Sequence, residues 1–117
     1  MFILRPEHEA AFSKAGLDRF TKRVQRWLRR DASADVAKLE AHTSLHEAIV
    51  FWIDISRRNG LLTEKQMYLF CQASLRLATK GCHLFEEQAF KTIIADNDST
   101  AEDRAQRIYW SVFGRKA

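Results

Sequence analysis

The chain has 117 residues, of which 46% are hydrophobic and 29% are charged, and its formal net charge is +4. This length predicts one domain over residues 1–117 with a core of its own, and the hydrophobic fraction excludes an intrinsically disordered chain. One proline and four glycines supply few turns for a β-sandwich, and no segment alternates like a strand, so we expect an all-α fold.

The first predicted helix begins near Pro6 and continues to about Arg30, because proline suits the first turn of a helix. On a helical wheel, its apolar residues fall on one side and its basic residues on the other. The apolar set is Leu17, Phe20, Val24, Trp27 and Leu28, and the basic set is Arg19, Lys22, Arg23, Arg26, Arg29 and Arg30. Acidic residues occur only at the ends of the basic set, as Asp18 and Asp31, so we expect that the segment does not neutralise its own charge.

Residues 31–42 are expected to form a loop with a short helix, in which Val36 and Leu39 face inward. Residues 45–59 predict the next helix, whose apolar side chains leave almost no polar face. Because a helix of this kind is normally packed on several sides, we expect it to be the central helix of the fold. Gly60 follows it and can adopt the left-handed conformation that ends helices.

Three more helices are predicted, over residues 64–80, 84–95 and 100–113. Capping boxes, in which two side chains three positions apart bond to each other's backbone amides, mark three helix starts. They pair Ser44 with Glu47, Thr63 with Gln66, and Ser99 with Glu102. The sequence therefore predicts an all-α, compact bundle of five to six helices joined by short loops.

The basic side of the first helix is the first candidate for function. Its six cations could contact phosphates or an acidic protein surface, or could form an ordinary solvated face. No helix-turn-helix spacing or zinc finger accompanies them, so nucleic acid is the less favoured partner.

Aromatic residues supply a second candidate. Tyr109, Trp110 and Phe113 cover too much of the helical wheel for one narrow core stripe, and Phe12 falls on the basic side of the first helix. Exposed aromatic residues beside arginines are typical of protein interfaces, although the same residues could simply close the edge of the core. We therefore take the basic set together with Phe12 and Trp110 as the candidate partner-binding residues. The aromatic residues of the tail could also support a dimer.

A pair of histidines has the spacing of metal ligands on a helix. His42 and His46 lie four residues apart, but no cysteine or acid accompanies them at ligand spacing, and Ser44 is expected to start a helix between them. We expect no metal site here.

Catalytic chemistry is not indicated elsewhere in the sequence. Cys71 and His83 could suggest a nucleophile and a base, but helical placement among apolar residues favours a buried, unreactive thiol. Asp54 needs a partner in its apolar helix, and Arg57 or Arg58 one turn later can form an ion pair with it. No glycine-rich phosphate loop, nucleophile elbow or paired-carboxylate motif occurs, so we expect a non-enzyme without a cofactor.

Localisation is expected to be cytoplasmic. The longest uninterrupted apolar run, Ala48 to Ile53, is far shorter than the roughly 20 residues that cross a bilayer. No cationic and then apolar leader precedes a cleavage site. Cys71 and Cys82 are expected to be small core residues of a reducing compartment rather than a disulfide.

A pattern spread over most of the chain resembles a family of small helical accessory proteins, encoded beside spike proteins and toxic effectors of bacterial type VI secretion systems. The resemblance covers the region from the first residues to about Asp96, and the tail from Asn97 to Ala117 departs from it. The matching residues are Ile3, Arg5, Glu7, Phe12, Phe20, Glu47-Ala48-Ile49, Trp52-Ile53, Arg58-Asn59-Gly60-Leu61, Thr63-Glu64, Leu77, Gly81, Phe85, Ile93 and Ile94.

The resemblance implies an adaptor or co-chaperone that binds a type VI effector or spike component without catalysing a reaction. It assigns no functional residues. Two alternatives stay open from the residues: an immunity protein that neutralises a toxin, and a basic regulator that binds nucleic acid.

Overall fold

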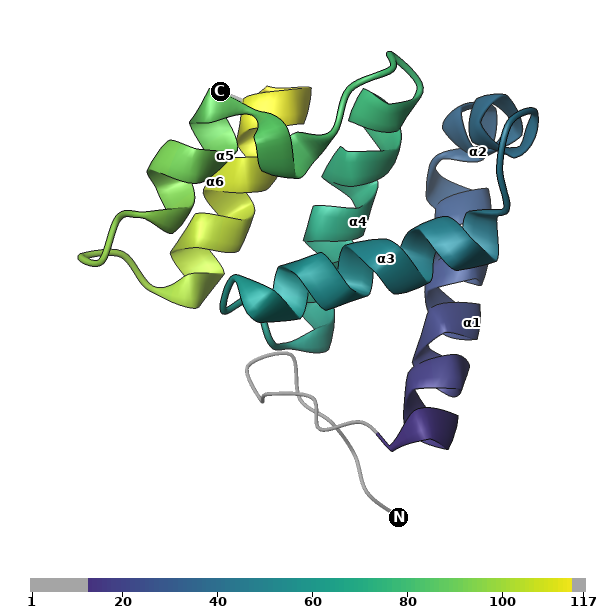
Figure 1. The fold of residues 1–117 in the computed structure, drawn as a ribbon, viewed down its shortest axis with the longest axis horizontal. Helices are drawn as coiled ribbons and strands as arrows, with labels where there is room; N and C mark the ends of the chain where they lie inside the picture. The colour runs from purple at the N-terminus through teal and green to yellow at the C-terminus, as the bar shows by residue number, and fades with distance from the viewer. Residues whose placement is uncertain (1–12, 115–117) are drawn as a thin grey trace.

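The computed structural model describes residues 13–114 and shows α-helices, one short 3-10 helix and no strand over that range (Figure 1). The helices in chain order are α1 (Lys14–Asp31), α2 (Ser33–Glu40), α3 (Leu45–Arg58), α4 (Glu64–Ala78), η1 (Leu84–Glu86), α5 (Gln88–Ile94) and α6 (Ala101–Phe113). The predicted all-α bundle of five to six helices is confirmed. Pro6 and Phe12, which carry two of the sequence predictions, lie outside the described residues.

One apolar core runs through the described helices. Its fully buried large side chains come from α1, α3, α4 and α6 and from the loop before α4. They are Phe20, Val24, Leu28, Leu45, Ile49, Ile53, Leu61, Met67, Phe70, Leu75 and Ile108. Val36 and Leu39 of α2 are also buried, as their spacing predicted.

The central position belongs to α4 rather than to α3. Helix α4 contacts α2, α3, η1 and α6, whereas α3 contacts α1, α2 and α4. The buried residues of α3 occupy one face, and on the outward face Val50 is 38% exposed and Phe51 is 48% exposed. The expectation that residues 45–59 form a helix is therefore confirmed, and α3 packs against three other helices, but Val50 and Phe51 leave part of its surface exposed.

The joint between α3 and α4 forms as its sequence predicts. Gly60 has φ +79°, and the amide of Leu61 donates to the Ser56 carbonyl at 3.0 Å, so a left-handed glycine closes α3. Thr63 and Gln66 then form a complete capping box, in which the Gln66 amide donates to Thr63 Oγ1 at 3.1 Å. Two strong local signals, a stop and a start, thereby fix the turn between the two helices.

The described part of α1 begins at Lys14, where Ser13 caps it by accepting from the Gly16 amide at 3.1 Å, and one predicted helix start differs from the structure. At α6 the cap is Thr100, whose hydroxyl accepts from the Asp103 amide at 3.0 Å. The neighbouring Ser99 hydroxyl instead donates to the Asp96 carbonyl at 3.1 Å, in the turn before the helix.

The predicted helix over residues 84–95 is divided at Glu87, which is extended with φ −73° and ψ 139°. Leu84 and Phe90 are 2% and 3% exposed. On an unbroken helix at about 100° per residue these two side chains would point roughly 120° apart. The break lets both side chains reach the same core.

Candidate functional site

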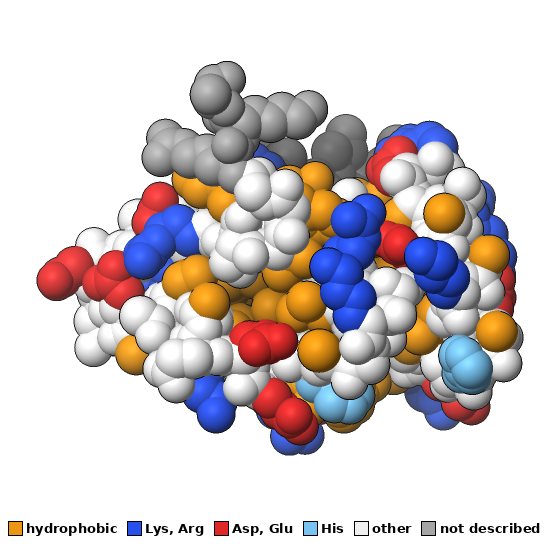
Figure 2. Space-filling model, turned by 90° about the horizontal axis from the view of Figure 1, so that it is seen from above, with side chains coloured by type: hydrophobic (Ala, Val, Ile, Leu, Met, Phe, Trp, Pro, Cys, Tyr) orange, Lys and Arg blue, Asp and Glu red, His pale blue; other side chains and the backbone are white. Residues whose placement is uncertain are grey.

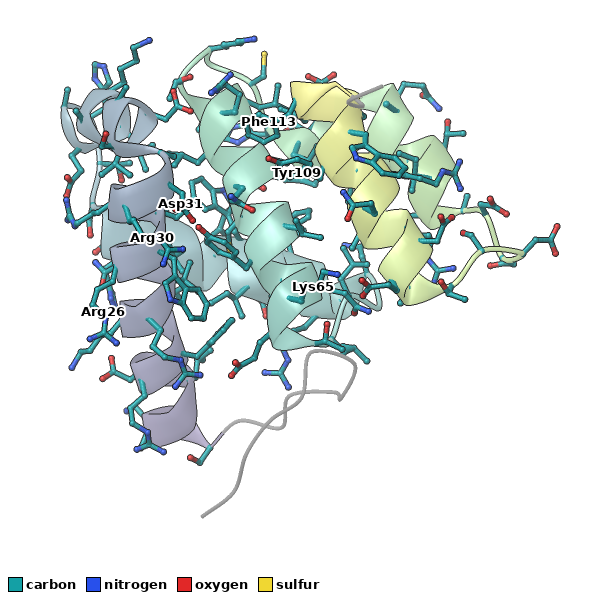
Figure 3. All side chains as sticks on the ribbon, turned by 180° about the vertical axis from the view of Figure 1, so that it is seen from behind. Arg26, Arg30, Asp31, Lys65, Tyr109 and Phe113 are labelled. Carbon is teal, nitrogen blue, oxygen red and sulfur yellow. The ribbon has the colours of Figure 1, made fainter. Side chains whose placement is uncertain are left out.

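The basic face of α1 consists of Arg19, Lys22, Arg23, Arg26, Arg29 and Arg30. Helical spacing places these side chains away from the buried side of the helix, and all except the half-buried Arg23 are exposed. A shallow hollow of about 530 Å³ lies among them, lined by Arg19, Lys22, Arg23, Gln25, Arg26 and Arg29. Arg26 lies on the outer side of α1 in Figure 3.

Four members of the basic face form ion pairs, two with the acids at the ends of their own segment and two with acids of other helices. Lys22 pairs with Asp18 at 3.2 Å, Arg23 with Glu64 at 2.6 Å, Arg29 with Glu40 at 2.8 Å and Arg30 with Asp31 at 2.7 Å. Two of these acids, Glu40 and Glu64, come from α2 and α4. Folding brings these two acids to α1, so the sequence of the α1 segment alone does not reveal them.

Arg19 and Arg26 form no ion pair with any residue between 13 and 114. They lie seven positions apart, two turns of the helix, so both project from the same side of α1. These two guanidinium groups are the part of the basic face with unsatisfied charge, and each carries five N–H donors. The arrangement is suited to binding carboxylates of an acidic surface.

Arg30 serves the fold through a small network at the end of α1. Its guanidinium donates to Asp31, and the Tyr68 hydroxyl of α4 donates to the same carboxylate at 2.7 Å. Arg30 first, and then Tyr68, lower the pKa of Asp31 to about 2, while burial and the carboxylate raise the pKa of Tyr68. Trp27 packs edge-on to the Tyr68 ring with centroids 5.2 Å apart. The network ties α1 to α4.

The aromatic residues of α6 belong to a different surface. Tyr109 and Phe113 stack with centroids 4.6 Å apart, and the Arg76 guanidinium lies 4.9 Å from the Phe113 ring centre. These rings and Trp110 are half-buried, so they close the edge of the core as well as facing outward. Figures 1 and 3 show α1 and α6 on opposite sides of α4. Trp110 therefore does not extend the basic face, and the predicted partner-binding set is not one continuous surface.

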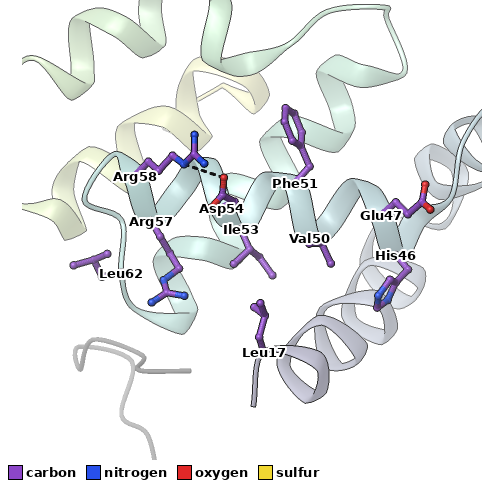
Figure 4. A pocket seen from close by; sticks show the side chains of 10 residues that line it. All are labelled: Leu17, His46, Glu47, Val50, Phe51, Ile53, Asp54, Arg57, Arg58 and Leu62. Atoms are coloured by element: carbon purple, nitrogen blue, oxygen red, sulfur yellow. Dashed lines mark ion pairs between the residues drawn. The ribbon is translucent and has the colours of Figure 1, made fainter. Parts of the chain in front are cut away.

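Sequence reasoning missed the outward face of α3. An open groove of about 910 Å³ runs along it (Figure 4). Its lining residues are Leu17, His46, Glu47, Val50, Phe51, Ile53, Asp54, Arg57, Arg58 and Leu62. The face seen from above in Figure 2 also shows hydrophobic side chains between acidic and basic ones. The signal in the sequence was the surplus of apolar residues around α3, which we interpreted as packing on several sides.

The remaining reactive residues do not assemble into a site. His42 lies in an exposed turn and His46 in the first turn of α3, and residues 13–114 contain no group of three or more potential metal-ligating side chains. Asp54 pairs with Arg58 at 3.0 Å on the surface, as the spacing predicted. Within the described residues, these side chains therefore do not converge on one site.

The two cysteines have opposite environments. Cys71 is fully buried in α4, and burial raises the pKa of its thiol, which keeps it protonated. Cys82 is exposed, so the expectation that both cysteines lie in the core is wrong for Cys82. Cys82 follows Gly81, whose φ of +76° ends the α4 segment and turns the chain to the surface. His83 is also exposed, and its ring packs near Phe85 rather than against the buried thiol.

Comparisons with known proteins give no further constraint on the site: no family model, no curated protein and no solved structure matches the chain. Within residues 13–114, no helix has both the length and the apolar character needed to span a membrane.

Proposed function

We propose that this chain is a non-catalytic accessory protein, an adaptor or co-chaperone, that binds another protein through the basic face of α1. The observation that carries the proposal is the pair Arg19 and Arg26, which are exposed and without an acidic partner in the described chain beside a shallow hollow. A flat, open, charged surface is suited to contact with a macromolecule. It does not enclose a small substrate.

The partner expected for this face carries carboxylates at matching positions. Exposed ion pairs such as Lys22–Asp18 and Arg29–Glu40 contribute little to stability, so an acidic partner can exchange with them at small cost. Arg23 is expected to stay with Glu64, because it also lies 5.5 Å from the Phe20 ring centre and is half-buried. The resemblance to type VI accessory proteins makes an effector or spike component encoded beside this gene the first partner to test.

The test is co-purification of the tagged chain with the products of its neighbouring genes, followed by binding to the purified partner. Arg19→Glu with Arg26→Glu is expected to weaken the complex by about ten-fold or more, because two attractions become repulsions. Lys38→Glu with Lys80→Glu is the matched control, since both lysines are exposed on other parts of the fold and the change in net charge is identical. Equal weakening by both double variants would contradict a specific role for α1.

The two alternatives are outcomes of the same experiment. A co-chaperone raises the soluble amount of its partner without protecting cells from it, whereas an immunity protein protects cells that express the toxin. A nucleic-acid-binding regulator would bind duplex DNA or RNA with an affinity that falls steeply as salt is added. Either of these last two results would replace the proposed function.

A further inference from the structure

Arg19 and Arg26, which form no ion pair with the described residues, lie on one line along the outer side of α1. At about 100° per residue they are about 20° apart around the helix. At roughly 1.5 Å rise per residue they are about 10.5 Å apart along it. The other cations of the basic face lie beside this line, with Lys22 and Arg29 on one side and Arg23 and Arg30 on the other.

Carboxylates border this line on both sides. Each of them pairs with a cation beside the line, as Asp18–Lys22, Glu40–Arg29, Glu64–Arg23 and Asp31–Arg30. Lys14, the remaining cation of α1, lies about 130° around the helix from the line and is not part of it. Within residues 13–114, the unpaired charge of the basic face is therefore confined to a narrow line with acids along both edges.

This charge pattern favours a narrow partner over a broad one. A wide acidic surface laid on α1 would bring its own carboxylates close to the acids at both edges, and like charges repel. A single acidic segment that lies along α1 contacts the line between those acids. Its carboxylates then meet Arg19 and Arg26, whose charges no described acid neutralises.

The same face shows how its arginines bind a carboxylate. Arg29 donates two hydrogen bonds to Glu40, at 2.8 and 2.9 Å, and Arg30 donates two to Asp31, at 2.7 and 2.8 Å. This two-bond geometry needs the planar guanidinium group, and the ammonium group of a lysine does not reproduce it. Arg19 and Arg26 carry the same group on the same face of the helix.

We propose that the partner binds α1 through one acidic helix, which places one carboxylate on Arg19 and another on Arg26, each held by two hydrogen bonds. The proposal rests on the proposed function and specifies the chemistry of the partner. Acidic residues seven positions apart on a helix lie on one side of it and about 10.5 Å apart along it, which matches the two arginines. Acidic residues five positions apart point about 140° away from each other, so only one of them can reach α1.

Two synthetic helical peptides are the probes for this proposal. Both consist of alanine and glutamine with two glutamates, so that composition and net charge are identical, and the glutamates are seven residues apart in one peptide and five in the other. Each peptide is titrated into the isotope-labelled chain, and NMR follows the Nε–H signals of the arginines. The seven-residue spacing is expected to shift the signals of Arg19 and Arg26 together and to bind about five-fold or more tightly, because it makes two ionic contacts instead of one.

A second arm tests the two-bond geometry. Arg19→Lys with Arg26→Lys keeps the net charge and is expected to reduce the affinity for the seven-residue peptide to about that for the five-residue peptide. Arg57→Lys with Arg58→Lys, on α3, is the matched control and is expected to bind like the wild type.

Equal binding of the two peptides, no binding of either, or full affinity in the Arg19→Lys/Arg26→Lys variant would overturn this inference. None of these results contradicts the proposed function, which instead fails if Arg19→Glu with Arg26→Glu leaves the complex with the natural partner intact.

Discussion

Replacing Gln66 tests whether the capping box between α3 and α4 stabilises the bundle. Its side-chain oxygen accepts from the backbone amides of Leu62 at 2.9 Å and Thr63 at 3.2 Å, and Gln66 is 5% exposed. Gln66→Ala leaves both amides without an acceptor in a site that is largely closed to water. A buried donor left unsatisfied costs about 1–3 kcal/mol, so the free energy of unfolding is expected to fall by about 2–4 kcal/mol.

Urea unfolding followed by circular dichroism measures this change. The slope of the free energy of unfolding against urea concentration should stay the same if the unfolded state is unaffected. Gln66→Glu keeps an acceptor and places a negative charge at a helix N-terminus, so it should cost less than about 1 kcal/mol. Gln72→Ala, in the middle of the same helix, is the matched control and is expected to be nearly neutral, because alanine favours helices. A loss below about 1 kcal/mol for Gln66→Ala would refute the assigned role of the box.

Three further predictions concern single residues. Gly60→Ala places a side chain at φ +79° and should lower the free energy of unfolding by about 1 kcal/mol or more, whereas Gly60→Asn should cost less; thermal unfolding distinguishes them. Arg30→Gln should raise the pKa of Asp31 from about 2 toward its ordinary value, measured by NMR titration of the carboxyl carbon. Because the pKa of Asp31 is lowered in the folded state, its ion pair with Arg30 stabilises the fold above the pKa of the unfolded state, and this contribution disappears as the pH falls toward 2. Arg30→Gln should therefore lose less free energy of unfolding than the wild type over that pH range. An unchanged dependence of stability on acid pH would contradict the pairing. A thiol reagent should modify Cys82 in the native protein and Cys71 only after unfolding, counted by mass spectrometry, and native labelling of both would contradict the burial of Cys71.

Local signals in the sequence were sufficient to predict most of the helices. The left-handed conformation of Gly60 and the capping box of Thr63 and Gln66 depend on residues that are close in the chain. The sequence of this short segment was therefore enough to predict both. The errors arose where two local options competed. Ser99 and Thr100 are adjacent residues with hydroxyl groups, and the sequence does not show that Thr100 takes the N-cap position while Ser99 donates to the Asp96 carbonyl.

The surface was harder to predict, because its properties depend on residues distant in sequence. Arg23 and Arg29 are neutralised by Glu64 and Glu40, which reach α1 only after the chain has folded. Likewise, the composition of α3 indicates hydrophobic surface but does not show which part other helices cover. Only the packed structure identifies Val50 and Phe51 as exposed, and Arg19 and Arg26 as the members of the basic face that form no ion pair with the described residues.

The proposed contact between α1 and an acidic protein can be measured by isothermal titration. The purified partner is titrated into the wild-type chain, the Arg19→Glu/Arg26→Glu variant and the Lys38→Glu/Lys80→Glu variant. We expect the dissociation constant to rise about ten-fold or more for the α1 variant alone. Unchanged affinity in the α1 variant would contradict the proposed function.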